Sequence, residues 1–117
     1  MEPTQPGQTL ETWTARIEKQ IADHPVMVFA KGEKHAAVCG FSHRVMQILD
    51  ATGVDYEVQN IFADPAIRPA LVAYSKWPTT PQIFIAGKFV GGCDILTEMY
   101  QNGDLQKMLE SLETSAG

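Results

Sequence analysis

The segment Ala37–Val45, AVCGFSHRV, places a single cysteine directly before a stretch with the composition of a helix. Upstream of it, Val26–Ala30 is a short apolar run of strand-forming residues, and downstream the apolar residues of Val45–Leu49 follow a helical spacing. We therefore expect Cys39 at a strand-to-helix turn, where unpaired backbone N–H groups favour a thiolate. Ser42 stands where a common redox motif carries a second cysteine, so Cys39 has no internal partner next to it.

Outward from this segment, the chain alternates between helical and strand patterns. A β-α-β unit in the first half favours two parallel strands joined by a right-handed crossover, and a glycine-centred hairpin in the second half adds two antiparallel strands. This order predicts an α/β fold, in which a four-stranded mixed sheet is flanked by helices on both faces. The expected helices are 10–23, 40–52, 64–75, 94–101 and 104–112; the expected strands are 26–30, 54–61, 82–86 and 88–90; and 31–38 is expected to be a polar loop.

Length and composition indicate one domain with an acidic surface. The chain has 117 residues and a net charge of −5, which argues against nucleic acid or an anionic membrane as its main partner. No apolar run reaches the ~18 residues of a transmembrane helix. We expect a flexible arm over residues 1–8, the domain over 9–113 and a frayed tail over 114–117. The two cysteines are too few for a secreted disulfide framework and indicate a reducing compartment.

Four motifs stand in order along the chain: Lys31-Gly32, Cys39–Ser42 (CGFS), Trp77–Gln82 (WPTTPQ) and Gly91–Ile95 (GGCDI). Together they resemble the monothiol, CGFS-type glutaredoxins of the single-domain subgroup, over roughly residues 10–112. The resemblance implies a thioredoxin-like fold with a cis peptide bond before Pro81. It also implies the cytoplasm of a bacterium, or the matrix of an organelle if an import segment has been removed.

The resemblance implies a binding site for glutathione. Lys31 and Arg68 would meet the glycine carboxylate of glutathione, and the backbone of Thr80 would pair with the extended peptide. Donors at Gly92 would meet the γ-glutamyl carboxylate, and Asp94 the γ-glutamyl amine. These charges complement the two carboxylates and one ammonium of glutathione. The full set of expected glutathione-binding residues is Lys31, Cys39, Phe41, Arg68, Thr80, Pro81, Gly92, Cys93 and Asp94.

Some positions depart from the family pattern. Ala37 stands where the family usually has proline, which predicts a more mobile loop before Cys39. Thr80 makes its wall of the groove more polar than the usual Ile or Phe. Pro69 disfavours a helical conformation of Arg68, so the direction of the Arg68 side chain stays open.

The resemblance implies two functions, both centred on Cys39. In the first, the protein carries a 2Fe-2S cluster as a homodimer, with Cys39 as metal ligand in each subunit and two glutathione thiolates completing four sulfur ligands. The apo protein would be mainly monomeric, a BolA-type protein could replace one subunit, and apo iron–sulfur proteins would receive the cluster. In the second, Cys39 is the catalytic thiol of a weak glutathione-dependent oxidoreductase.

The remaining cysteine and the histidines have simpler interpretations. Cys93 either fills space beside the groove or forms a disulfide with Cys39 under oxidation, and the sequence leaves both open. His24, His35 and His43 show no metal-site spacing and are expected to be surface residues.

Overall fold

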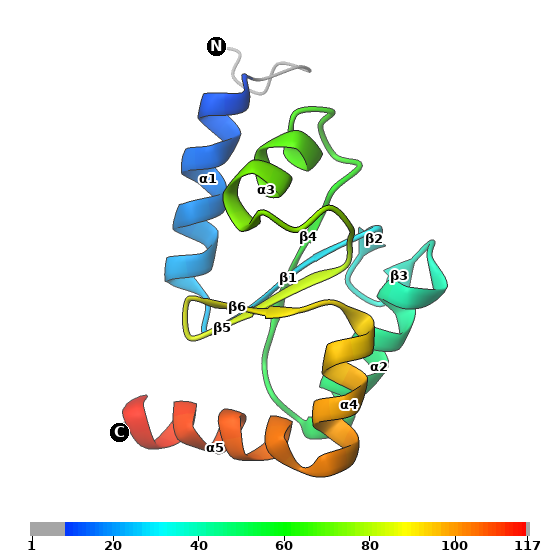
Figure 1. The fold of residues 1–117 in the computed structure, drawn as a ribbon, viewed down its shortest axis with the longest axis vertical. Helices are drawn as coiled ribbons and strands as arrows, with labels where there is room; N and C mark the ends of the chain where they lie inside the picture. The colour runs from blue at the N-terminus through cyan, green and yellow to red at the C-terminus, as the bar shows by residue number, and fades with distance from the viewer. Residues whose placement is uncertain (1–8, 117) are drawn as a thin grey trace.

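The computed structural model describes the backbone of residues 9–116 and the side chains of residues 9–112. The expected arm, 1–8, and position 117 lie outside the described residues. The elements, labelled in Figure 1, are α1 (Leu10–Asp23), β1 (Val26–Ala30), β2 (Gly32–Glu33), β3 (Ala36–Ala37), α2 (Gly40–Thr52), β4 (Glu57–Asn60), α3 (Ile67–Ser75), β5 (Gln82–Ile85), β6 (Lys88–Gly91), α4 (Cys93–Asn102) and α5 (Asp104–Ala116).

A four-stranded mixed sheet forms the centre of the domain. Its strand order is β4-β1-β5-β6, with β1 parallel to β4 and antiparallel to β5, and with β5 antiparallel to β6. Every residue of β1 and β5 is buried, as expected for inner strands covered on both faces. The mixed sheet predicted from the order of elements is therefore confirmed.

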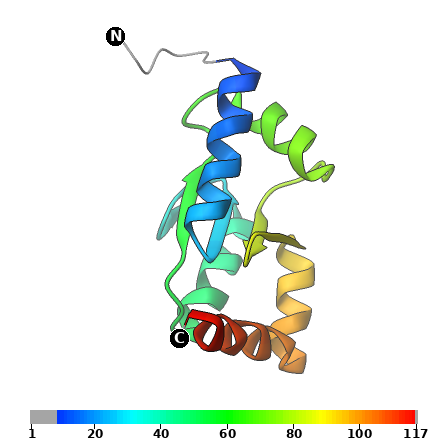
Figure 2. The same cartoon turned by 90° about the vertical axis from the view of Figure 1, so that its left-hand side faces the viewer.

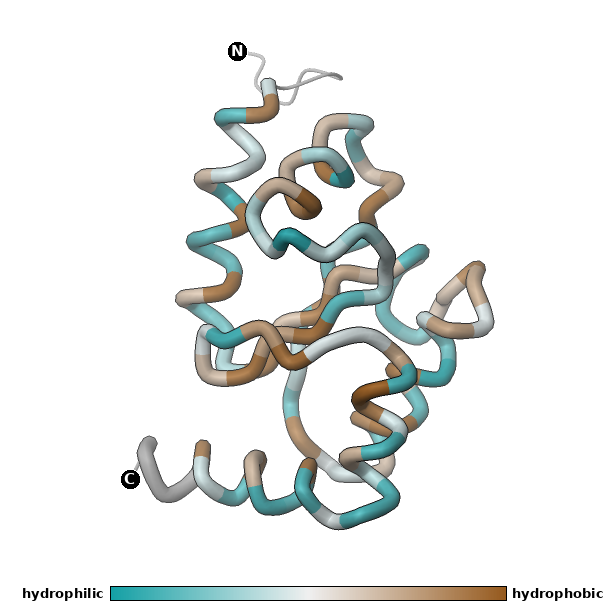
Figure 3. Tube along the Cα trace, in the orientation of Figure 1, coloured by the Kyte–Doolittle hydropathy of each residue, from teal (hydrophilic) through white to brown (hydrophobic). Residues whose placement is uncertain are grey.

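Helices cover both faces of this sheet (Figures 1 and 2). On one face, Met27 and Phe29 pack with apolar residues of α1 and α3, and Phe29 meets Phe84 edge to face with ring centroids 5.7 Å apart. On the other face, Val26 and Val28 pack with apolar residues of α2, α4 and α5. Because side chains alternate along β1, they pack into two separate cores, one on each face of the sheet. In Figure 3 the strongly apolar residues follow the central strands. Within residues 9–116, no helix is both long enough and apolar enough to cross a bilayer.

Local capping contacts mark the start of α1 and the end of α2. The Thr9 hydroxyl oxygen accepts a hydrogen bond from the N–H of Thr12 at 3.1 Å, which begins α1. Gly53 adopts the left-handed conformation, with φ of 77°, directly after α2. Both helices lie where the sequence placed them.

Three other boundaries differ from the prediction. The helix expected from Asp64 begins at Ile67, because the Asp64 carboxylate accepts the N–H of Ala66 at 2.8 Å and closes a turn before the helix. The strand expected over 54–61 is limited to Glu57–Asn60, where the chain pairs with β1. The last helix continues to Ala116, so it runs through most of the segment expected as a tail.

The polar loop expected over residues 31–38 is instead a small hairpin. Gly32 pairs with Ala37 and Glu33 pairs with Ala36, and the N–H of Val38 donates to the carbonyl of Lys31 at 2.9 Å. Gly32 makes this possible, because its φ is +121° and a Cβ there would lie 2.6 Å from the carbonyl oxygen of Ala36. The hairpin brings the residue after β1 back beside the residue before Cys39.

We expect Gly32→Ala to open the hairpin, because the added methyl group would collide with backbone atoms of β3. Gly53→Ala is the matched control, since Gly53 also has a positive φ but has no atom within 4 Å of the added Cβ. The control should lose about 1–2 kcal/mol of the free energy of unfolding, and Gly32→Ala about 1–3 kcal/mol more. Urea denaturation of both variants measures the difference, and equal losses would contradict the close packing at Gly32.

Candidate functional site

Cys39 occupies the N-cap position of α2, as predicted. Its backbone is extended, with φ of −129°, and its carbonyl accepts the N–H of His43 at 2.9 Å. The side chain is half-buried and makes no regular capping hydrogen bond. The sulfur therefore stands at the positive end of a helix with one side open to solvent.

The surroundings of Cys39 lower the pKa of its thiol. The backbone N–H of Ser42 has the largest effect, burial opposes it, and the N–H of Phe41, the charge of Lys31 and the hydroxyl of Ser42 lower the pKa further. A lower pKa means that the thiolate persists at lower pH than in an ordinary cysteine. The site therefore presents a nucleophile that is also a soft metal ligand.

Ser42 is a buried residue that supports this arrangement. Its side chain is fully buried, and its Oγ accepts the backbone N–H of Lys31 at 3.0 Å. The same hydroxyl lowers the pKa of Cys39 by a side-chain hydrogen bond. Ser42 thus ties the end of β1 to the first turn of α2, a role that the sequence did not reveal.

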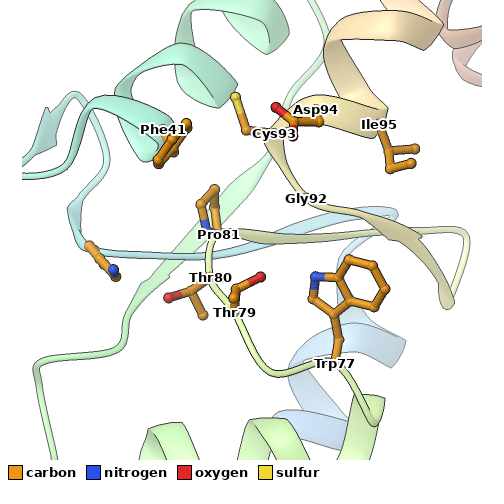
Figure 4. Close-up of a pocket in the computed structure, with 10 residues that line it drawn as sticks. Phe41, Trp77, Thr79, Thr80, Pro81, Gly92, Cys93, Asp94 and Ile95 are labelled. Atoms are coloured by element: carbon orange, nitrogen blue, oxygen red, sulfur yellow. The ribbon is translucent and has the colours of Figure 1, made fainter.

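A groove of about 310 Å³ opens beside Cys39 (Figure 4). Seven residues predicted to form the site line it: Lys31, Phe41, Thr80, Pro81, Gly92, Cys93 and Asp94. Trp77, Thr79 and Ile95, which were not on the predicted list, line it as well. The peptide bond between Thr80 and Pro81 is cis, as expected.

The register of the sheet brings these distant segments together. Phe29 pairs with Gln82, so Lys31 at the end of β1 lies near Pro81 at the start of β5. Ile83 pairs with Gly91, so the start of α4 comes to the same edge. A Cβ on Gly92 would lie 3.2 Å from the carbonyl oxygen of Pro81, which shows how closely the two walls approach.

Two predicted residues do not line the groove. Cys39 lies next to it, since Lys31 lines the groove and its charge acts on the Cys39 thiol. Arg68 is exposed near the start of α3 and is not among the residues that line the groove. Pro69 is accommodated there because backbone N–H groups in the first turn of a helix have no partner within it.

Gln82 holds the wall formed by residues 77–80. It is fully buried, and its amide nitrogen donates to the carbonyls of Trp77 and Thr79, each at 3.0 Å, while its Oε1 has no partner among the described residues. The Trp77 ring packs on Phe89 with centroids 5.5 Å apart, and Phe89 packs on Phe84 in the core. Trp77 is therefore an anchor of the groove wall, and Gln82 is a support that the sequence did not reveal.

The opposite wall is the start of α4. Asp94 is exposed in its first turn, and Cys93 is half-buried with its sulfur directed toward α2 in Figure 4. The hydroxyl of Thr97 lies 3.9 Å from the Cys93 sulfur and donates to the Cys93 carbonyl at 2.8 Å. The groove thus combines a cation at Lys31, a carboxylate at Asp94 and the N-terminus of a helix, a combination suited to a zwitterionic ligand.

The described residues contain no group of three or more His, Cys, Asp or Glu side chains placed to hold a metal ion. Both cysteines are free thiols. Of the two, Cys39 has the electrostatic surroundings that favour a thiolate.

Comparisons with known proteins agree with the geometry. The family model described as glutaredoxin matches residues 26–90. An uncharacterized monothiol glutaredoxin of Synechocystis is 50% identical over 96 residues, covering 82% of this chain and 90% of the relative. The solution structure of reduced poplar apo GrxS14 is 40% identical with a TM-score of 0.78, covering 89% of this chain and 96% of that one. The crystal structure of a buckwheat glutaredoxin–glutathione complex is 30% identical, also with a TM-score of 0.78, covering 87% and 91%. The expected resemblance and the thioredoxin-like fold are confirmed.

We expect Ser42→Ala to raise the pKa of Cys39, because the substitution removes a hydroxyl that lowers it. Less thiolate would then be present at pH 7, and alkylation by iodoacetamide would be slower. The pH profile of the alkylation rate, measured in a Cys93→Ser background so that only Cys39 reacts, should shift its midpoint upward. Ser111→Ala, at an exposed position of α5, is the control, and an unchanged midpoint in Ser42→Ala would refute the role of the hydroxyl.

We expect Gln82→Met to loosen the wall that carries Trp77, because the carbonyls of Trp77 and Thr79 lose their donor. Two lost hydrogen bonds correspond to about 1–3 kcal/mol of the free energy of unfolding. The emission of Trp77, measured in a Trp13→Phe background, should shift toward that of an exposed indole. Gln101→Met, at an exposed position of α4, is the control and should change neither the free energy of unfolding nor the emission of Trp77. If Gln82→Met also changes neither, the wall that carries Trp77 does not need the support of Gln82.

Proposed function

The chain belongs to the glutaredoxin family, and on that premise we propose that it binds glutathione beside Cys39 and carries a 2Fe-2S cluster between two copies of itself. The observation that carries the proposal is the Cys39 thiol, with its lowered pKa, next to a groove with opposite charges on its walls. A relative of known structure supports it, since the buckwheat glutaredoxin is described in complex with glutathione.

The groove offers a complementary partner for each charge of glutathione. Lys31 would meet the glycine carboxylate, Asp94 the γ-glutamyl ammonium, and the N-terminus of α4 the γ-glutamyl carboxylate. Thr80 precedes β5 and stands outside its ladder with β1, so its backbone would pair with the extended tripeptide. This orientation would place the glutathione sulfur near Cys39. Arg68 is exposed and does not line the groove, so Lys31 would be the main partner of the glycine carboxylate and Arg68 would supply a second cation for it.

The number of sulfur ligands supports a carrier with two subunits. A 2Fe-2S cluster is commonly held by four thiolates, and each chain would give one through Cys39. A second chain and two molecules of glutathione would supply the other three. Val38 is 74% exposed and Phe41 62% exposed on either side of Cys39, so apolar surface surrounds the thiol where the second copy would approach.

The proposed cargo is delivered to other proteins. Half of the cluster ligands would be tripeptides that dissociate, which suits transfer to apo iron–sulfur proteins better than storage. A BolA-type protein could take the place of the second copy on the same surface. Two free thiols suit a reducing compartment, either the cytoplasm of a bacterium or the matrix of an organelle.

The thiolate favoured at Cys39 also supports a second candidate function, thiol–disulfide exchange. The Cys39 thiolate would attack the glutathione sulfur of a glutathionylated protein, and the protein thiol would leave as a thiolate and take up a proton. A second glutathione thiolate would then attack the new mixed disulfide, release oxidised glutathione and restore the Cys39 thiolate. Ser42 cannot resolve the mixed disulfide in place of this glutathione, because a hydroxyl does not form a disulfide.

Anaerobic reconstitution with iron, sulfide and glutathione tests the carrier function. The protein should acquire visible absorbance and elute as a dimer in size-exclusion chromatography, and without glutathione it should stay colourless and monomeric. Cys39→Ser should lose the cluster, whereas Cys93→Ser should retain it, since Cys93 is not among the proposed metal ligands.

Two results would reverse the proposal. A cluster that persists after all glutathione is removed would show that the ligand set is wrong. Rapid turnover of a glutathionylated peptide by the apo protein, lost in Cys39→Ser, would make the oxidoreductase the main function.

A further inference from the structure

The turn of the β2–β3 hairpin is held in an unusual conformation. His35 has a φ of +63°, in the left-handed region that residues with a side chain seldom adopt. Its backbone N–H donates to the sulfur of Met46 on α2 at 3.2 Å. The tip of the hairpin is therefore fixed to α2 at Met46, seven residues after Cys39 in the sequence.

Three side chains outside the four sequence motifs meet at this tip. The Asp50 Oδ1 accepts the hydroxyl of Tyr56 at 2.7 Å, and the His35 Nε2 lies 3.1 Å from the same oxygen. The Tyr56 hydroxyl is also 3.3 Å from the His35 Nε2, and the two rings meet edge to face with centroids 6.3 Å apart. The three residues come from the hairpin tip, from α2 and from the segment before β4, so together they join three parts of the chain. We call them the hairpin clasp.

The charges in the hairpin clasp favour an ionised Asp50 and a protonated Tyr56. Burial raises the pKa of Asp50, but hydrogen bonds from His35 and Tyr56, together with the charges of His35 and Lys34, lower it below its ordinary value. Burial and the neighbouring Asp50 raise the pKa of Tyr56, which keeps its hydroxyl protonated as a donor. Lys34 donates from its Nζ to the Tyr56 carbonyl at 2.8 Å and lies 4.3 Å from the centre of the Tyr56 ring. Asp50 is thus a carboxylate that faces two basic side chains and one hydroxyl donor.

The other end of the same hairpin belongs to the functional site. Lys31, which lines the groove, accepts the N–H of Val38 through its carbonyl at 2.9 Å. Cys39 follows Val38 directly. Asn60 holds the β2 side, since its Oδ1 accepts the N–H of Gly32 and its Nδ2 donates to Glu33, each at 3.1 Å. A movement of the tip would therefore be transmitted along β3 to Val38, whose N–H bonds the Lys31 carbonyl.

We propose that His35, Asp50 and Tyr56 are positioning residues that hold the β2–β3 hairpin so that Lys31 and Cys39 keep the spacing a glutathione molecule needs. The part of this inference that concerns glutathione rests on the proposed function. Ala37 was expected to make the segment before Cys39 more mobile, and the contacts of the hairpin clasp at the tip would oppose that mobility. His35 is exposed, as the sequence indicated, yet it has a structural role that a solvated histidine lacks.

The hairpin tip has more than one attachment in the clasp. The His35 Nε2 lies 3.1 Å from the Asp50 carboxylate and 3.3 Å from the Tyr56 hydroxyl. Lys34, the residue before His35, donates from its Nζ to the Tyr56 carbonyl at 2.8 Å. The hydrogen bond from Tyr56 to Asp50 fixes these two partners relative to each other.

Two variants test the clasp against one matched control. His35→Asn keeps a residue that tolerates the left-handed conformation but is too short to reach Asp50. Asp50→Asn keeps an oxygen acceptor and removes the charge. His24→Asn removes an imidazole of the same type at the C-cap of α1, away from the hairpin, and is the control.

The first measurement is the protection of the Val38 amide against hydrogen exchange, followed by NMR at a single fixed pH. In His35→Asn the protection should be about 3- to 10-fold lower than in the wild type, because the contacts of His35 with Asp50 and Tyr56 are lost. Asp50→Asn should lower the protection as well, because the carboxylate that His35 and Tyr56 share is removed. If His35→Asn and Asp50→Asn both match His24→Asn, the hairpin clasp has no positioning role and the inference is overturned.

The second measurement is the affinity for S-methylglutathione, whose blocked sulfur removes any effect of Cys39 titration. His35→Asn should weaken the affinity for S-methylglutathione by the same factor by which this variant lowers the protection of the Val38 amide. Its melting temperature should stay within a few degrees of that of the control. If His35→Asn reduces the protection of the Val38 amide but leaves the affinity for S-methylglutathione unchanged, the link between the hairpin clasp and the groove is overturned. If the wild type does not bind the probe at all, the proposed function fails, and the amide protection still decides whether the clasp holds the hairpin.

Discussion

The hydrogen bond from the Lys31 N–H to the buried Ser42 Oγ is the contact on which the site depends. It fixes the first turn of α2 against the end of the central strand, so the helix N-terminus and the sheet edge meet at Cys39. A sulfur in place of this oxygen would be a weaker acceptor. The serine therefore does two things at once: it leaves Cys39 without a disulfide partner in its own motif, and its hydroxyl helps to lower the pKa of the thiol.

Much of the fold could be predicted because its signals are local. The inner strands are short apolar runs, and Thr9 and Gly53 mark helix ends through contacts within a few residues. The errors occurred where a local pattern was ambiguous. Asp64-Pro65 suggested a helix start, but the Asp64 side chain closes a turn first. The β2–β3 hairpin has too few residues to show an alternating pattern, and its return depends on the conformation of Gly32.

The groove was predictable to the extent that its residues belong to recognisable motifs. The motifs named seven of the lining residues, while the sheet register that unites them is a property of the assembled fold. The supports were missed because each depends on a partner distant in the sequence or on backbone atoms. Ser42 bonds a residue 11 positions away, and His35 bonds one 15 positions away. Gln82 holds two carbonyls of the adjoining loop, which no side-chain pattern records.

These supports explain how an open groove would select a flexible tripeptide such as the proposed ligand. Asp94 is exposed and Lys31 is half-buried, and charge pairs at such positions contribute about 1 kcal/mol or less. Affinity must then come from walls that are already in place, since ordering a loop at the moment of binding consumes binding energy. Ser42, Gln82 and the hairpin clasp fix three of those walls in advance. Because each proposed contact to the ligand is individually weak, a bound tripeptide would still be able to leave, and the proposed carrier function requires both properties.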